Sequence, residues 1–153
     1  MVKPVRLKKS AVEKESYLVW NAYIDLLATS DYQELNDIQR QAHLVFWYES
    51  EVQNGGHLQY FENQGTERLA ETIAALKALD AGDQAKILDA AAQQYLSTHK
   101  DQDDDGDIAD FVSEALKGGF NEFDKQFQDC AITLQKHLAD YLAAHQAEFV
   151  EII

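Results

Sequence analysis

Residues 48–65 read YESEVQNGGHLQYFENQG, the most distinctive segment of the sequence. Two adjacent glycines separate a long helical pattern before them from a short one after them. Glycine adopts helix-ending conformations at little cost, and paired glycines let two helices approach closely. Amide and carboxylate side chains beside the glycines can bond the backbone groups that such a kink frees. We therefore predict a helix–Gly-Gly–helix corner with a buried polar network, formed by Glu51, Asn54, Gly55, Gly56, Gln59 and Asn63. A ligand pocket at this corner is an alternative interpretation.

Helical patterns continue outward from the corner in both directions. Pro4 is the only proline, and no segment alternates apolar and polar residues as a half-buried strand would. Apolar spacing and capping residues predict helices over about 11–28, 37–53, 57–63, 67–79, 84–99 and 108–117, and one long helix from Asn121 or Asp124 to His145. We expect an all-α protein: one compact domain of six or seven helices over residues 11–153.

Length and composition narrow the class of protein. A chain of 153 residues has the size of one domain, and 46% hydrophobic residues argue against disorder. The single cysteine, Cys130, excludes an intramolecular disulfide. No apolar run is long enough to cross a bilayer, and the basic start has no apolar stretch behind it. We expect a cytoplasmic protein that binds no membrane.

The charge is strongly negative and unevenly distributed. Thirteen basic residues oppose 27 acidic ones, for a net charge of −14. Lys3, Arg6, Lys8 and Lys9 lie near the start with no acid among them, so we expect residues 1–10 to form a flexible basic arm. The acidic remainder repels nucleic acid and anionic membrane, which are polyanions. Its expected partners are cations, basic proteins or proteins that ordinarily bind DNA, although acidity that serves only solubility is an alternative.

The most acidic segment, DQDDDGD at residues 101–107, matches the first half of an EF-hand calcium loop. The second half fails, because position twelve is Val112 where a bidentate glutamate is needed. A calcium-binding protein is therefore only a third hypothesis for this chain. The alternatives to calcium binding are that the segment is a solvated loop between two helices or that it belongs to an anionic contact surface.

Motifs for catalysis or metal binding are absent from the sequence. The five histidines form no HExxH or Glu-x-x-His pattern, and isolated helix histidines are usually exposed or satisfied core residues. No GxSxG, P-loop or GxGxxG motif occurs. We expect no enzymatic activity, no metal site and no cofactor.

A family resemblance rests on two segments. ESEVQNGGHLQYFENQG, residues 49–65, resembles the ExEVxNGG signature of the bacterial DNA-mimic protein family. Residues 123–127, FDKQF, resemble the Leu-Asp-x-x-Phe opening of the last helix in that family. The resemblance implies an all-helical fold, often dimeric, without catalysis. It also implies an acidic face that occupies the DNA-binding surface of a regulator.

Our first functional hypothesis is a DNA mimic that binds a helix-turn-helix transcriptional regulator or another basic DNA-binding protein. Carboxylates at i and i+4 on a helix are separated by about 6 Å of rise, which is comparable to neighbouring phosphates. The expected contact residues are Glu67, Glu71, Asp101, Asp103, Asp104, Asp105, Asp107, Asp110 and Glu114. The alternative is an immunity-type or adaptor protein that binds one toxin or enzyme.

A homodimer is expected from the resemblance and from a surplus of aromatic residues near the corner. These residues are Trp20, Trp47, Tyr48, Tyr60 and Phe61. Large rings of this kind supply much of the buried area at protein interfaces, but they can equally fill a core.

Overall fold

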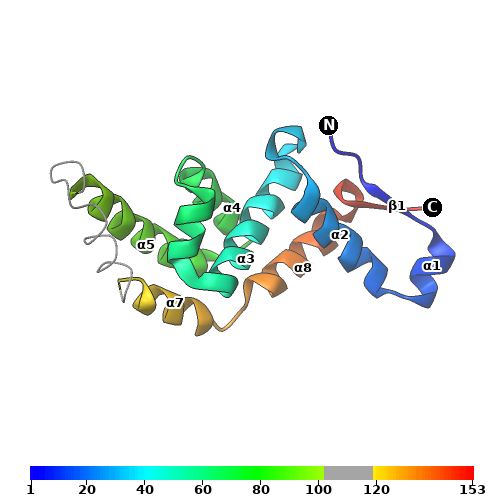
Figure 1. The fold of residues 1–153 in the computed structure, drawn as a ribbon. Coiled ribbons are helices and arrows are strands. Elements are labelled where there is room, and N and C mark those ends of the chain that lie inside the picture. Colours follow the sequence, from blue (N-terminus) through cyan, green and yellow to red (C-terminus); the bar gives the residue numbers. More distant parts are fainter. Residues whose placement is uncertain (102–118) are drawn as a thin grey trace.

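A computed structural model describes residues 1–101 and 119–153, with side chains over 1–98 and 119–153 (Figure 1). In that part of the chain the helices are α1 (Lys9–Lys14), α2 (Tyr17–Thr29), α3 (Asp37–Gln64), α4 (Leu69–Ala78), α5 (Gly82–Asp101), α7 (Asn121–Gln128) and α8 (Leu134–His145). Two 3-10 turns, η1 (Tyr32–Glu34) and η2 (Gln146–Glu148), and two short strands, β1 (Val5–Leu7) and β2 (Val150–Ile152), complete it. The expected all-α class is confirmed.

Helix α3 is the central element of the fold. It packs against α2, α4, α7 and α8, and it contributes the fully buried Tyr48 and Phe61 to the core. Tyr23 of α2 is also fully buried, and its hydroxyl donates to the carbonyl of Leu138 in α8 over 3.2 Å. Buried apolar side chains of this size provide most of the folding free energy, at roughly 2–3 kcal/mol each.

The long helix begins as its sequence predicts. Asn36 accepts a hydrogen bond from the backbone of Gln39, and the Gln39 side chain accepts one from the backbone of Asn36. This reciprocal capping box satisfies amides that the first helical turn leaves without partners. The Gln39 amide is itself fully buried and also donates to the carbonyls of Val2 and Glu148, so the cap joins both ends of the chain to α3.

The prediction of one continuous final helix was wrong. Residues 129–133 are not helical, and the helix divides into α7 and α8. Thr133 begins α8, since its hydroxyl accepts from the backbone of Lys136 over 3.2 Å. A threonine that caps a new helix competes with continuation of the old one. Ala131 and Ile132, which continue the apolar period of the expected helix, are therefore exposed.

Two other helix boundaries also differ from the sequence prediction. The helix expected over 11–28 is interrupted at Glu15, which has φ −139° and ψ 86°, and only α2 of the two pieces buries residues in the core. The helix expected from about residue 84 begins earlier, at Gly82, and the chain turns between α4 and α5 at Asp80, whose φ is 65°. The next amide, that of Ala81, donates to the carbonyl of Leu76, as at many helix ends where glycine takes this position.

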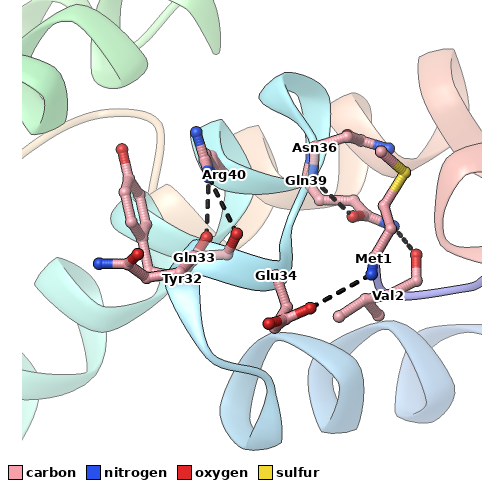
Figure 2. A network of polar contacts seen from close by, with 8 residues as sticks. All are labelled: Met1, Val2, Tyr32, Gln33, Glu34, Asn36, Gln39 and Arg40. Carbon is pink, nitrogen blue, oxygen red and sulfur yellow. Dashed lines mark hydrogen bonds and ion pairs between the residues drawn. The ribbon is translucent and has the colours of Figure 1, made fainter.

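The two ends of the chain lie side by side at one end of the molecule, and α5 and α7 lie at the other (Figure 1). Strands β1 and β2 pair in parallel, with Val5 opposite Val150 and Leu7 opposite Ile152. Figure 2 shows the amino group of Met1 bonded to Glu34 and the carbonyl of Val2 bonded to Gln39. Residues 1–10, expected to be a flexible arm, thus contact the body in this structure, because their apolar side chains pack against the core.

Candidate functional site

The corner predicted at Gly55-Gly56 is present as a kink within α3. Gly55 has φ −155° and ψ 15°, and Gly56 has φ 81° and ψ −178°, so neither is helical. The conformation of Gly56 is one that residues with a side chain rarely adopt. A Cβ atom at this position would also lie 2.5 Å from Oδ2 of Asp124, which reaches the kink from α7. Both the backbone and the neighbouring carboxylate therefore require glycine here.

The Asp124 carboxylate fastens the second half of α3. Its Oδ1 accepts hydrogen bonds from the His57 backbone amide over 2.8 Å and from His57 Nδ1 over 2.7 Å. The other ring nitrogen, Nε2, lies 2.8 Å from the Tyr48 hydroxyl. These contacts assign the ring proton to Nδ1 and make Nε2 the acceptor of the tyrosine proton. The three side chains form one chain of hydrogen bonds between both halves of α3 and α7.

Burial controls the ionisation of this cluster. The His57 side chain has no exposed surface, and its burial lowers the histidine pKa although contact with Asp124 favours the proton. Burial likewise raises the pKa of Tyr48 well above its usual value. At neutral pH the histidine and tyrosine are therefore uncharged beside an aspartate that is one-third exposed. Because a ring with no exposed surface cannot reach a substrate, the arrangement is suited to holding the corner in place.

The polar residues expected at the corner form a second cluster nearer the surface. Oε2 of Glu51 accepts hydrogen bonds from the side-chain amides of Asn63, over 2.7 Å, and Gln59, over 3.4 Å. The structure thus brings together Glu51, Gln59 and Asn63, whereas Asn54 is exposed beside them. This network bridges the two halves of α3 on its solvent side, so it is not buried as we expected.

The deeper cluster was not predicted from the sequence, because His57 and Asp124 are 67 residues apart. Two signals were available: His57 directly follows the glycine pair, and Asp124 lies in the second segment of the family resemblance. The structure shows that these two segments meet at the corner.

Two of the expected acidic contact residues lie on the described surface. Glu67 and Glu71 are both exposed, but α4 begins at Leu69, so Glu67 precedes the helix and the pair does not share a helical face. Asp103, Asp104, Asp105, Asp107, Asp110 and Glu114, together with the side chain of Asp101, lie outside the described residues. The half EF-hand loop lies there as well.

The aromatic residues near the corner mostly fill the core. Tyr48, Tyr60 and Phe61 are at most 4% exposed, so they cannot supply the surface of a dimer. Tyr48 packs edge-on against Tyr60 and Phe127, with ring centroids 5.1 and 5.6 Å apart. Tyr48 and Phe127 also pack against the buried His57 ring, with centroids 5.6 and 6.0 Å from it.

The match to a known family covers most of the chain. Residues 33–145 match the family model described as DMP19-like protein. The chain belongs to the DMP19-like family. The matched region contains both segments on which the resemblance rests, and it contains the whole of the α3 corner and α7. Searches of the curated proteins and of the solved structures found no match.

Two further properties bear on the kind of site that the protein can hold. Across the described part of the chain, no three His, Cys, Asp or Glu side chains gather in a group that could hold a metal ion. The helices described there are too short or too polar to span a membrane.

Proposed function

We propose that this protein is a non-enzymatic DNA mimic, which occupies the DNA-binding surface of a helix-turn-helix regulator or another basic DNA-binding protein. The observation that supports this most is membership of the DMP19-like family, a DNA-mimic family, in a chain whose net charge is −14. DMP19-like proteins are not a known enzyme family. A surface of this charge would be recognised by the same cationic groups that contact phosphates.

Most of the negative charge in the described part is left without a cationic partner. Lys136 pairs with Asp140, Arg6 lies 3.5 Å from Glu151, and the Met1 amino group lies 3.2 Å from Glu34. The remaining described carboxylates have no lysine, arginine or terminal amine within 4 Å, and Asp124 contacts a neutral histidine. The acids therefore stay available to a basic partner.

Several of these acids lie on two helices that pack against each other, α4 and α5, and on the segments that precede them. The exposed members are Glu67, Glu71, Asp80, Asp83 and Asp89. We propose that Glu67 and Glu71 contact the partner, together with the acids of residues 101–114. Tertiary packing, rather than one helix, would then set the spacing of the charges.

A competition assay against DNA tests the proposal. A regulator captured with the protein from its native cells at low salt is mixed with labelled operator DNA, and release of DNA is measured over a range of salt concentrations. Counterion release makes the logarithm of affinity fall with the logarithm of salt, with a slope of about −0.9 per neutralised charge. The double variant Glu67→Gln, Glu71→Gln should make that slope shallower by about 2.

A matched control removes the same charge elsewhere. The variant Glu13→Gln, Glu15→Gln changes two exposed carboxylates on and beside α1, far from α4 and α5 (Figure 1). It should leave the slope unchanged. If no DNA is released at low salt, mimicry is wrong; if binding hardly depends on salt, the partner is of the toxin or enzyme class that an adaptor would hold.

A further inference from the structure

A small cavity lies between η1, α3 and the start of α4, away from the glycine corner. Its volume is about 60 Å³, which is room for a few water molecules or one small ligand. Tyr32, Trp47 and Tyr60 supply aromatic walls, and Arg68 supplies a positive charge. The remaining lining includes the Gln64 side-chain amide, which can donate hydrogen bonds. The Thr72 hydroxyl also lines the cavity, and it donates to the carbonyl of Arg68 over 2.8 Å.

Two of the three arginines in the chain lie against the Tyr32 ring beside this cavity. The guanidinium of Arg68 is 3.9 Å from the ring centroid and that of Arg40 is 4.8 Å from it. Figure 2 shows that Arg40 donates to the carbonyls of Tyr32 and Gln33, over 3.0 and 3.1 Å, and so holds η1 in place. Within the described part of the chain, the Arg68 guanidinium donates to no such acceptor.

The charge of Arg68 is also unbalanced. In the described residues no carboxylate lies within 4 Å of Arg68 or Arg40, although the chain has 27 acids. Glu67 lines the same cavity but lies beyond that distance. An arginine fork matches a carboxylate in two parallel hydrogen bonds, and such pairs are about twice as strong as neutral ones. Arg68 is exposed and lines the cavity, so its guanidinium is accessible to a carboxylate that enters from solvent.

Two neighbouring groups add to the preference for an anion. Arg68 is the N-cap of α4, and no side chain caps the amides of that first turn. A helix N-terminus carries partial positive charge. His43 lines the cavity with its Nδ1 3.1 Å from the Leu27 carbonyl, and burial, with a further contribution from Arg68, lowers its pKa. The histidine is thus neutral at pH 7, so Arg68 rather than His43 would supply the positive charge for a bound anion.

We propose that this cavity binds a small carboxylate of about the size of acetate, with the Arg68 guanidinium as its partner and Tyr32 and Trp47 as its walls. The argument for this site does not rest on the proposed DNA mimicry, although Glu67 lines the cavity and is also a proposed partner contact. A small organic acid would then bind at Arg68, a cation that lies between the acidic residues Glu67 and Glu71 in the sequence.

The test follows the two tryptophan indole signals by NMR. The protein is titrated with sodium acetate that replaces sodium chloride at constant ionic strength and pH. Trp47 lines the cavity, whereas Trp20 lies on α2 and serves as an internal control; Trp20→Phe assigns the two signals. We expect the Trp47 indole signal, and the backbone amide signal of Gly65, which also lines the cavity, to shift and saturate with a Kd near 1 mM, which corresponds to about −4 kcal/mol.

Arginine variants decide the charge partner. Arg68→Met should abolish the saturable shift, and Arg68→Lys should weaken it about tenfold, because lysine cannot make the paired contact. Lys77→Met, an exposed cation on the same helix, should bind as the unchanged protein does. If Arg68→Met perturbs the fold, Arg68→Lys decides alone.

The proposal is overturned by any of three results. The first is the absence of saturation at tens of millimolar acetate. The second is that Arg68→Met and Arg68→Lys both bind acetate as tightly as the unchanged protein does. The third is saturation by inorganic phosphate but not by acetate.

Discussion

Replacing Gly56 by alanine tests the account of the corner most directly. Its φ of 81° with ψ of −178° lies in a region that is essentially restricted to glycine, where a side chain costs about 1–3 kcal/mol. The new Cβ would also lie 2.5 Å from Oδ2 of Asp124. That carboxylate cannot move freely, because its Oδ1 holds both the backbone amide and the ring of His57.

The magnitude follows from these two contributions. Hydrogen bonds to a charged group contribute about 1.5–3 kcal/mol, and the one-third exposure of Asp124 favours the lower part of that range. Loss of one such bond added to the backbone strain lowers the free energy of unfolding by about 3–5 kcal/mol. This is a large part of the roughly 5–15 kcal/mol that stabilises a typical domain.

Gly65 provides a matched control. It has nearly the same backbone conformation, with φ 69° and ψ −164°, but a Cβ there would meet nothing within 4 Å. Gly65→Ala should therefore lose only the strain contribution of about 1–3 kcal/mol. The difference between the two variants, about 2 kcal/mol in urea unfolding, measures the contact with Asp124.

A double-mutant cycle locates the effect. In an Asp124→Ala background the carboxylate is gone, so Gly56→Ala should lose no more stability than Gly65→Ala does. Strict additivity of Gly56→Ala and Asp124→Ala would show that the two positions are not coupled, and it would refute this account of the corner.

Three other perturbations test the structure. Tyr48→Phe leaves Nε2 of the buried His57 without its donor, so urea unfolding should show a loss of about 1–3 kcal/mol, and an unchanged midpoint would contradict the hydrogen bond. Burial lowers the His57 pKa in the folded state, so the unfolded state binds the proton more readily. The free energy of unfolding should therefore fall as the pH drops below about 6.5, by up to about 1.4 kcal/mol per pH unit. The variant His57→Gln should make this pH dependence weaker. Deleting residues 1–7 removes β1 and three side chains packed on the core, so it should lower the thermal midpoint by several degrees. As a control, Arg6→Ala breaks only the exposed pair with Glu151 and should change the free energy of unfolding by less than about 1 kcal/mol.

Local signals predicted much of the fold. Asn36 caps α3 as its position before an apolar periodic segment indicates, and the glycine pair kinks the same helix. Each signal acts within one or two turns of chain, so it can be recognised without knowledge of distant residues. The signal at Thr133 was equally local, but the apolar residues around it, such as Ala131, continued the helical period and masked it. The helix ends there because Phe127 and Leu134 are buried in the core whereas Ala131 and Ile132 are not, and the sequence alone does not show this difference.

The candidate site was predicted only in part for a related reason. The surface cluster of Glu51, Gln59 and Asn63 lies within one stretch, whereas the buried contact of His57 with Asp124 joins two elements far apart in sequence. Similarly, Glu67 and Glu71 have helical spacing in sequence, yet the helix begins between them.

The all-α class, the net charge of −14 and the position of the kink can be read from the amino-acid sequence, because composition and short-range backbone preferences carry that information. Tertiary structure alone decided that Asp124 holds His57, that β1 pairs with β2, and that two arginines meet at Tyr32. Such contacts form between segments whose local sequences are compatible with many partners, and only the packing of the whole chain selects among them.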